Sequence, residues 1–500
     1  MKMFKGNFKA WQWYTIIVSM IVYSIFYFVR KNFSIAMPGL TAEYGISNTS
    51  FGIVIAIGSL VYGFSRFING FIVEKMSTKV FMAVGLFLCA AANFCFGFGL
   101  ELSYAITGVH QGPQFINMLI LVIGVTIVLN QYFQGCGFPP CARMLPQWIA
   151  PNELATKMSI WNTSHSIGAV IAVVICGLIM TNMGADMSGN SSIVAQITGN
   201  LAGSIKDWYN IPHAEQQAKI MSYATHYGAW RWCFFIPGIV ALGGTALALL
   251  ALHDTPQSVG FPEIEGTETG KDAIKDKKGA HKGFLNHMVF RNKWVWYFTT
   301  ANIFVYVLRM GVLDWGPKFL TEDRGMNIKD ASWSVAAFEI TAIIGTIFAG
   351  WATDRLFKGK AHRMCLFSMI GSVLFFGIFA LVPMPTIPSI CMLALAGFCI
   401  YGPQALIGIG AANQATKEAS ATANGVTGIL GYIGSALSAL AIGIIADNLG
   451  WNWVFITFII TGLVGAIIFL FMWNAPRDGY KRAQDYTRNL LNEQKQEQDK

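Results

Sequence analysis

Long apolar runs alternate with short polar segments along this chain from Trp11 to Trp473. A helix needs about 20 apolar residues to cross the roughly 30 Å apolar core of a bilayer, and twelve runs have about that size. The runs are continuously apolar, so they predict helices and exclude the short alternating strands of an outer-membrane barrel. They begin near residues 12, 51, 80, 115, 155, 231, 292, 331, 364, 388, 421 and 450.

The composition agrees with a membrane protein. Only 12% of the residues are charged, whereas soluble domains carry about 25%. The 37 Phe, 15 Trp and 16 Tyr residues suit lipid-facing and interfacial surfaces. The nine cysteines lie in or at the end of apolar runs without metal-ligand spacing, so we expect small core residues and no metal or other cofactor. These features exclude a disordered chain, a secreted disulfide scaffold and an ordinary soluble enzyme.

The Lys and Arg residues lie mainly on one predicted side of the membrane. With an inward N-terminus, the inner loops and the tail hold 25 of the 35, the outer segments hold six, and four lie within or at the end of apolar runs. Cytoplasmic loops carry such an excess, so both termini are expected in the cytoplasm of a bacterial-type inner membrane. This topology also explains the net charge of +9 without a nucleic-acid partner.

Two polar stretches interrupt the runs. Residues 254–290 form a Lys-rich central loop, which predicts an N-terminal six-helix half over 1–253 and a C-terminal half with a cytoplasmic tail over 291–500. The expected fold is therefore an all-α membrane protein with twelve transmembrane helices in two pseudo-symmetric halves. The long outer loop 183–229 is expected to be a solvated insertion with a short helix over Ala214–Ala224, the alternative being a functional lid.

Two short motifs occur once in each half, at offsets of 279 and 280 residues. A parallel six-plus-six duplication is typical of transporters that rock about a central site. In the second motif, Gly allows close helix contact, and the acidic and basic residues are expected to pair at the cytoplasmic helix ends and hold one gate state. The first motif is Tyr27-Phe28-Val29-Arg30 and Tyr306-Val307-Leu308-Arg309; the second is Gly70-x-x-x-Glu74-Lys75 and Gly350-x-x-x-Asp354-Arg355.

Arg30 and Arg309 occupy corresponding positions at membrane depth, where a charge costs about 2.5–3.5 kcal/mol. Two cations that converge on one cavity form a site for an anion, and guanidinium groups suit bidentate contact with phosphate or carboxylate oxygens. The alternative is that each Arg pairs with a buried acid or extends to the interface. Lys31 is expected to extend to the outer interface.

Several other polar residues lie within the runs. Arg66 is either a third anion contact or the partner of an acidic group. His165 is either a packing group or, beside a polyanion, a ligand whose protonation follows the substrate. Glu339 and Asp314 are the expected acidic partners of the cations, although Asp314 also fits a helix exit.

Tyrosines near these charges are candidate hydroxyl donors to the cavity, although tyrosines are also common interfacial anchors. Nothing in the sequence supports covalent chemistry, since no phosphate-binding Gly-Lys-Ser loop, H-E-x-x-H or G-x-S-x-G motif appears in context. We therefore expect a transporter driven by a gradient, not an enzyme, and a single chain suffices for it. The tyrosines are Tyr23, Tyr27, Tyr306, Tyr401 and Tyr432.

Seven segments spread over nearly the whole chain resemble the organophosphate:phosphate antiporter family of the major facilitator superfamily. They are Arg30-Lys31-Asn32-Phe33-Ser34-Ile35-Ala36-Met37-Pro38, Tyr62-Gly63-Phe64-Ser65-Arg66, Phe133-Gln134-Gly135 with Pro139-Pro140-Cys141, Trp161-Asn162-x-x-His165, Asp254-Thr255-Pro256-Gln257-Ser258, Phe304-Val305-Tyr306-Val307-Leu308-Arg309 and Tyr401-Gly402-Pro403. The resemblance implies the major facilitator fold and exchange of an external organophosphate for internal inorganic phosphate. It also implies that Arg30 and Arg309 grip the phosphoryl group with a contribution from His165.

Within that family the chain most resembles the glycerol-3-phosphate transporters. Hexose-phosphate carriers have an Asp and a Lys where this chain has Asn424 and Thr427, whereas glycerol-phosphate carriers have a Thr at the latter position. Two departures are Arg66, where those carriers have Lys, and the long 183–229 loop. Alternatives are a hexose-phosphate or phosphoglycerate carrier, or a sugar-phosphate sensor that signals to a partner kinase. A proton-coupled symporter or drug exporter would need a titratable carboxylate at the centre, where this chain is cationic.

Overall fold

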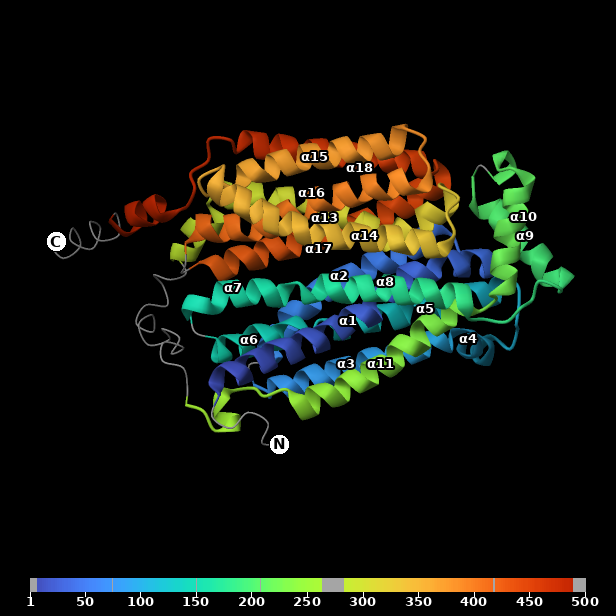
Figure 1. The fold of residues 1–500 in the computed structure, drawn as a ribbon, viewed down its shortest axis with the longest axis horizontal. Helices are drawn as coiled ribbons and strands as arrows, with labels where there is room; N and C mark the ends of the chain where they lie inside the picture. Colours follow the sequence, from blue (N-terminus) through green and yellow to red (C-terminus); the bar gives the residue numbers. More distant parts are fainter. Residues whose placement is uncertain are drawn as a thin grey trace. The chain divides into compact units, whose positions relative to one another are not determined.

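The computed structural model describes residues 7–73, 75–149, 151–206, 208–262, 283–416 and 419–488, most of which are helical (Figure 1). Within them, one isolated antiparallel bridge joins Ala185 and Tyr227. The helices are α1 (Phe8–Tyr44), α2 (Asn48–Val73), α3 (Thr78–Gly97), α4 (Gly99–Thr107), α5 (Pro113–Gln134), α6 (Phe138–Trp148), α7 (Pro151–Asn162), α8 (Ser164–Asn182), α9 (Ser191–Ser204), α10 (His213–Thr225), α11 (Ala229–Ala251), α13 (Lys293–Glu322), α14 (Ile328–Arg355), α15 (Ala361–Leu381), α16 (Thr386–Ala415), α17 (Ser420–Asn448) and α18 (Trp451–Phe471), with short helical turns η1 (Trp208–Asn210), η2 (Pro256–Val259) and η3 (Asn286–Phe290).

Eleven helical segments within the described residues are long and apolar enough to cross a membrane. The remaining predicted run is α13, which has the length of 30 residues but carries Arg309, Asp314 and Lys318 in its second half. The fourth run is divided into α5 and α6, and the fifth into α7 and α8. The prediction of an all-α, multi-pass membrane protein is confirmed.

The described chain falls into two compact units. The first contains residues 1–267, 310–340 and 436–454, and the second contains 268–309, 341–435 and 455–500. Helix α13 contributes its first half to the second unit and its last turns to the first. Residues 263–282, most of the predicted central loop, lie outside the described residues, and the division into two halves at 254–290 stays a prediction.

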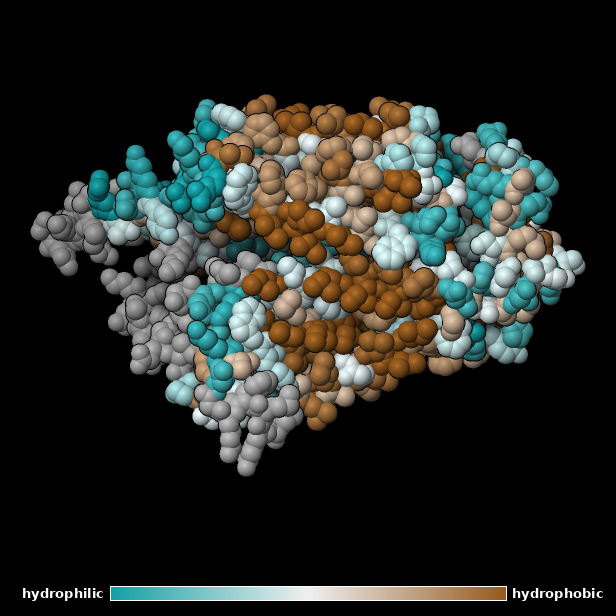
Figure 2. Space-filling model, viewed as in Figure 1, coloured by the Kyte–Doolittle hydropathy of each residue, from teal (hydrophilic) through white to brown (hydrophobic). Residues whose placement is uncertain are grey.

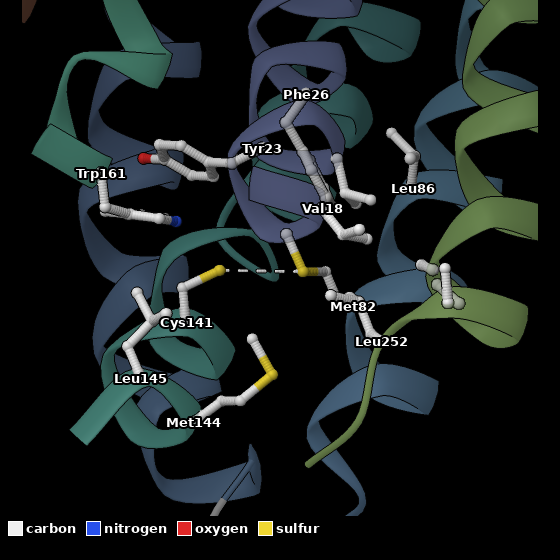
Figure 3. Packing of buried hydrophobic residues seen from close by; sticks show 14 of the residues in the cluster. Val18, Tyr23, Phe26, Met82, Leu86, Cys141, Met144, Leu145, Trp161 and Leu252 are labelled. Carbon is white, nitrogen blue, oxygen red and sulfur yellow. Dashed lines mark hydrogen bonds between the residues drawn. The ribbon is translucent and has the colours of Figure 1, made fainter. Parts of the chain in front are cut away.

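In the first unit, α1 is the central helix. It begins at Asn7, whose side chain accepts a hydrogen bond from the Ala10 N–H at 3.2 Å, and it ends at Gly45, whose φ of +66° suits a left-handed C-cap. Its inward side joins a buried apolar cluster with α3 and α6 (Figure 3). There the Cys141 thiol points at the Met82 sulfur, 3.8 Å away. Six of the nine cysteines are buried as expected, whereas Cys95 and Cys391 are exposed and Cys399 is partly exposed.

In the second unit, α13 packs closely on α17 because glycines face it. A Cβ on Gly434 would lie 2.5 Å from the Ile303 carbonyl oxygen, and one on Gly431 would lie 2.7 Å from the Asn302 amide. Helix α15 lies along α16, where Gly371 faces the Cys399 sulfur. Small residues at membrane helix crossings let the backbones approach in this way.

The membrane-facing surface is apolar. On α8, Ile167, Ile171, Ile175 and Leu178 are all exposed at spacings of three and four residues, which places them on one helix face. Figure 2 shows that apolar side chains cover this part of the surface. A stripe of this kind suits contact with lipid chains.

The 183–229 segment differs from the expected solvated insertion. The predicted helix over Ala214–Ala224 is present as α10, but α9 was not expected. The two helices enclose a buried cluster that includes Ile197, Leu201 and Trp208. Because apolar residues of the segment pack on one another, it forms a compact domain, which we call the cap (residues 183–228).

Asp254 fixes the start of α3. Its carboxylate accepts hydrogen bonds from the Ser77 hydroxyl at 2.6 Å and from the Thr78 and Lys79 N–H groups at 3.0 and 2.9 Å. An acidic group at a helix N-terminus is favourable. Burial by itself would raise the pKa of Asp254, but the hydrogen bonds from Ser77, Thr78 and Lys79 together lower it below its ordinary value.

Replacing Asp254 by Ala should therefore lower the stability of the folded chain by about 2 kcal/mol, seen as a lower thermal unfolding midpoint in detergent at pH 7. Since the pKa is lowered on folding, the contribution is present above the pKa of the unfolded chain and is lost as the pH falls through the lowered value. The exposed Asp485, replaced by Ala, is the control. Equal midpoints for the two variants at pH 7 would contradict this role.

Candidate functional site

Arg30 lies on α1 against aromatic rings. The centre of its guanidinium group is 3.8 Å from the centroid of the Tyr62 ring and 5.5 Å from that of Tyr27. Tyr62 is buried and Arg30 is half-buried. A guanidinium close to the face of an aromatic ring is attracted by the ring electrons, so the two rings help to hold Arg30 in position.

His165 lies just after a break between two helices. Helix α7 ends at Asn162 and α8 starts at Ser164, and the His165 Nδ1 contacts the Asn162 carbonyl oxygen. Since a carbonyl only accepts, Nδ1 carries a proton and donates it, which leaves Nε2 as the ring position for other partners. The His165 ring lies 5.6 Å from the Tyr27 ring, so Tyr27 is a common neighbour of Arg30 and His165.

Close packing of α1 and α8 places these residues together. A Cβ on Gly168 would lie 2.8 Å from the Tyr27 Cβ and 2.9 Å from the Ser24 Cα. The Ser24 hydroxyl also donates to the Ser164 carbonyl oxygen at 2.8 Å. Only a residue without a side chain permits this approach.

Arg66 has a different neighbour from Arg30. Its guanidinium centre is 4.4 Å from the ring centroid of Phe138, the first residue of α6. The structure therefore places the two candidate anion-binding arginines of the first unit, Arg30 and Arg66, against aromatic rings of α2 and α6. Whether Arg66 contacts substrate stays a prediction.

In the second unit, Arg309 lies over a tyrosine ring as Arg30 does. Its guanidinium centre is 4.6 Å from the Tyr401 centroid, and both side chains are buried. Tyr306 packs on Tyr432 with ring centroids 5.6 Å apart. Four of the predicted residues thus lie on α13, α16 and α17 of this unit.

Thr427 has hydrogen bonds within the helix packing. Its hydroxyl donates to the Ala423 carbonyl oxygen at 2.7 Å and lies 3.2 Å from the Thr299 hydroxyl. The Asn302 amide donates to the Thr427 carbonyl oxygen at 2.9 Å. Thr427 therefore joins α17 to α13, a role that the sequence did not indicate.

Lys31 does not extend to the interface, and that expectation is wrong. The residue is 6% exposed, and its Nζ lies 2.5 Å from the Asp314 carboxylate. The pair joins α1 to the last turns of α13 inside the first unit. Burial decides the outcome, because a lysine surrounded by helices is stabilised by a nearby carboxylate more than by a distant headgroup.

A second polar group near the end of α13 was not predicted. Lys318, fully buried, lies 2.7 Å from Glu322 and contacts the Thr41 hydroxyl. The Trp451 indole N–H donates to Glu322 at 3.0 Å. The charges within the seventh apolar run were the available signal, but sequence alone did not show which of them face α1.

Helix α17 is joined to α2 in the same unit. The Asp447 carboxylate accepts from the Asn48 and Thr49 N–H groups at 3.1 and 2.7 Å and from the Thr49 hydroxyl at 2.6 Å, which caps the start of α2. Nearby, a Cβ on Gly443 would lie 2.5 Å from the Asn48 carbonyl oxygen. We call the Lys31–Asp314, Lys318–Glu322 and Asp447 contacts the closing layer.

The sequence profile of the Major Facilitator Superfamily matches residues 19–439. The chain belongs to this superfamily. It is 34% identical over 465 residues to the glycerol-3-phosphate transporter of Bacillus subtilis, covering 91% of each chain. It is 30% identical over 494 residues to a probable hexose phosphate transport protein of Chlamydia trachomatis, covering 96% of this chain and 94% of the relative. Within the superfamily it therefore belongs with the organophosphate transporters.

The chain is also similar to a membrane sensor protein and to a solved transporter structure. The membrane sensor protein UhpC of Escherichia coli is 27% identical over 481 residues, with 95% of each chain covered. The crystal structure of a bacterial homologue of the human lysosomal transporter Spinster, in an inward-facing and unoccupied conformation, aligns with a TM-score of 0.67 at 14% identity over 93% of this chain and 97% of that one. The predicted major facilitator fold is confirmed.

The predicted cytoplasmic gate residues of this superfamily member are at the ends of α2 and α14. Lys75, Asp354 and Arg355 are exposed, and Glu74 lies outside the described residues. Glu339 is buried in the middle of α14. Arg143, which the sequence did not single out, donates to the Met76 carbonyl oxygen at 2.8 Å and so holds the turn after α2. The pairing of the gate residues stays a prediction.

Removing one member of the Lys31–Asp314 pair should be costly. In Lys31→Met, Asp314 is left buried opposite an apolar side chain, and we expect a loss of about 3 kcal/mol, measured as a lower thermal unfolding midpoint in detergent. Lys31→Met/Asp314→Leu should recover part of the loss because no lone charge is then buried. Exposed Lys329→Met serves as the control, and a single variant as stable as this control would refute the pair's role.

Proposed function

We propose that this chain exchanges an organophosphate, in particular glycerol 3-phosphate, for inorganic phosphate across a bacterial inner membrane by alternating access. The observation that carries the proposal is the repeated placement of an arginine over a tyrosine ring, Arg30 on Tyr62 and Arg309 on Tyr401. The relatives described as glycerol-3-phosphate and hexose phosphate transporters support the phosphate class of substrate. The Lys and Arg distribution supports cytoplasmic termini, and one chain suffices for the site.

Phosphate is the anion that best fits these side chains. A guanidinium presents two parallel N–H groups to two phosphate oxygens, and it keeps its charge when dehydrated. The ring beside each guanidinium restricts its movement before the substrate arrives, which reduces the entropy lost on binding. His165 supplies a further donor through Nε2 when its ring is protonated.

Substrate binding and closure act on the same two helices in this proposal. Arg30 directly precedes Lys31 on α1, and Arg309 precedes Asp314 by five residues on α13. Opening at the closing layer requires Lys31 to separate from Asp314. In the proposal, the binding energy of phosphate contacts on α1 and α13 offsets part of the cost of that separation. Each substrate thus lowers the barrier to switching, and transport becomes exchange instead of leak.

Phosphate exchange in proteoliposomes tests the proposal. Labelled phosphate should enter vesicles loaded with phosphate, and Arg30→Lys or Arg309→Lys should each reduce the exchange rate by about 10- to 100-fold, because lysine loses the bidentate contact. Arg363→Lys is the matched control, since Arg363 also lies over an aromatic ring, 4.5 Å from the Trp473 centroid, but is not a candidate site residue. Its exchange rate should stay unchanged.

The same assay separates the alternatives. Glycerol 3-phosphate should inhibit phosphate exchange at lower concentrations than glucose 6-phosphate or phosphoglycerate. Binding of a sugar phosphate without exchange would instead favour a sensor, which the similarity to a membrane sensor protein makes the second candidate. Rapid uptake into vesicles without internal phosphate would contradict obligatory exchange.

A further inference from the structure

A hollow of about 520 Å³ lies on the surface of the second unit, beside the start of α13. Arg291 and Lys293 are at its polar side, and Ile468 of α18 is at its apolar side. The aromatic residues Phe290 and Trp296 form further walls and are 49% and 40% exposed. Such a combination of cations, aromatic rings and aliphatic groups is typical of a membrane interface.

The hollow has a positive electrostatic environment. Arg291 and Lys293 are exposed cations, and Arg482 approaches them by donating to the His287 and Arg291 carbonyl oxygens, each at 3.0 Å. Burial lowers the pKa of His287, and the charges of Arg482 and Arg291 lower it further. The lining contains no acidic residue among the described side chains.

The apolar wall is held in place. The Trp296 indole N–H donates to the Phe290 carbonyl oxygen at 2.8 Å, so the ring has a fixed orientation. Phe298, one turn of α13 away from Trp294, packs edge-on against Phe469 of α18 with centroids 6.4 Å apart. The two helices that border the hollow are therefore in direct contact.

We propose that this hollow binds an anionic phospholipid, with the phosphate at Arg291 and Lys293 and an acyl chain along Trp296 and Ile468. Basic pockets between transmembrane helices bind such headgroups. The exposed apolar wall favours a lipid over free phosphate, which gains nothing from it. The site is separate from the proposed transport site, since it contains none of the candidate substrate residues.

Native mass spectrometry of the full-length protein in detergent tests this site. Phosphatidylglycerol should remain bound more than phosphatidylcholine, and Arg291→Gln/Lys293→Gln should reduce the phosphatidylglycerol-bound fraction about five-fold or more. The control Lys358→Gln/Lys481→Gln removes two exposed cations and should leave binding unchanged. Equal binding by the site variant and the control, equal retention of both lipids, or displacement of the lipid by millimolar inorganic phosphate would overturn the proposal.

The contacts of the cap support a second inference, which is independent of the lipid site. On one side it is attached to α1, because the Gln196 and Asn200 amides donate to the Glu43 and Ala42 carbonyl oxygens at 2.7 and 3.1 Å. At the last residue of the cap, the Gly228 N–H donates to the Glu43 carboxylate at 2.8 Å. The cap is thus fixed to the N-terminal helices.

On its other side, the cap holds the ends of two later helices. The Lys219 ammonium donates to the Thr321 carbonyl oxygen in the last turn of α13 at 3.0 Å, and Lys206 donates to that of Asn448, the last residue of α17, at 3.2 Å. A cation at a helix C-terminus satisfies a free carbonyl and the negative end of the helix dipole. Two lysines therefore make the same kind of contact with two helices of the closing layer.

We infer that the cap is a latch that stabilises the state in which the ends of α13 and α17 are held against α1 and α2. This rests on the proposed alternating access, in which those ends must separate. The cap remains bound to α1 while Lys206 and Lys219 release their carbonyl partners. The insertion thereby slows opening at the closing layer without contacting the substrate.

A buried cysteine reports this opening. Ser332 on α14 is 1% exposed, and its side chain faces Gly177 of α8, so a thiol from Ser332→Cys should react with a membrane-impermeant maleimide only when the helices separate. Adding Lys206→Met/Lys219→Met should raise the labelling rate about five-fold or more. The matched control Lys9→Met/Lys329→Met removes two exposed lysines and should leave the rate unchanged, with labelling of the native cysteines subtracted.

Equal labelling rates in the latch variant and its control would overturn the latch. Because labelling measures opening and not exchange, its result is separable from the transport assay. Faster labelling in a protein that does not exchange phosphate would reject the proposed function and retain the latch.

Discussion

A buried ion pair between α1 and α13 is the interaction on which the closing layer depends. Lys31 and Asp314 lie 2.5 Å apart, with side chains only 7% and 15% exposed. Removing two charges from water is costly, and their attraction offsets that cost only while they remain together. The pair therefore favours one arrangement strongly, and any other arrangement must hydrate both groups or supply new partners. This is the behaviour expected of a two-state element, whose intermediate positions are disfavoured.

Glycines at the helix crossings allow the helices to change between two arrangements with little loss of packing. Gly177 faces Ser332, Gly443 faces the Asn48 carbonyl, and Gly168 faces Ser24. At each crossing the glycine presents only backbone, and it faces mainly backbone atoms or the small side chain of Ser332, so no large side chains interlock there. Helices packed in this way can separate or slide without repacking large side chains. The glycine contacts do not favour one helix arrangement over the other, so the polar groups of the closing layer determine which arrangement is more stable.

The sequence predicted the parts of this structure that follow from local pattern. Apolar length predicted the membrane helices. The repeat of Tyr27–Arg30 at Tyr306–Arg309 predicted that both arginines face one central cavity, and this stays a prediction. It did not predict that Lys31 is buried, because the choice between a headgroup and Asp314 depends on which residues of α13 face α1. The cap was underestimated for a similar reason, since Ile197, Leu201 and Trp208 form a core only when α9 and α10 meet.

The aromatic neighbours of the two arginines explain how a ring contact helps to stabilise a cation at membrane depth. A lone arginine at membrane depth would lower its energy by turning toward water or a carboxylate. The rings of Tyr62 and Tyr401 lie 3.8 and 4.6 Å from the guanidinium centres, and they attract the cation through a face that has no strong hydrogen-bond acceptor. The ring contact thereby adds to the stabilisation of the cation at membrane depth. Unlike a carboxylate, a ring face does not compete with a phosphate for guanidinium N–H donors.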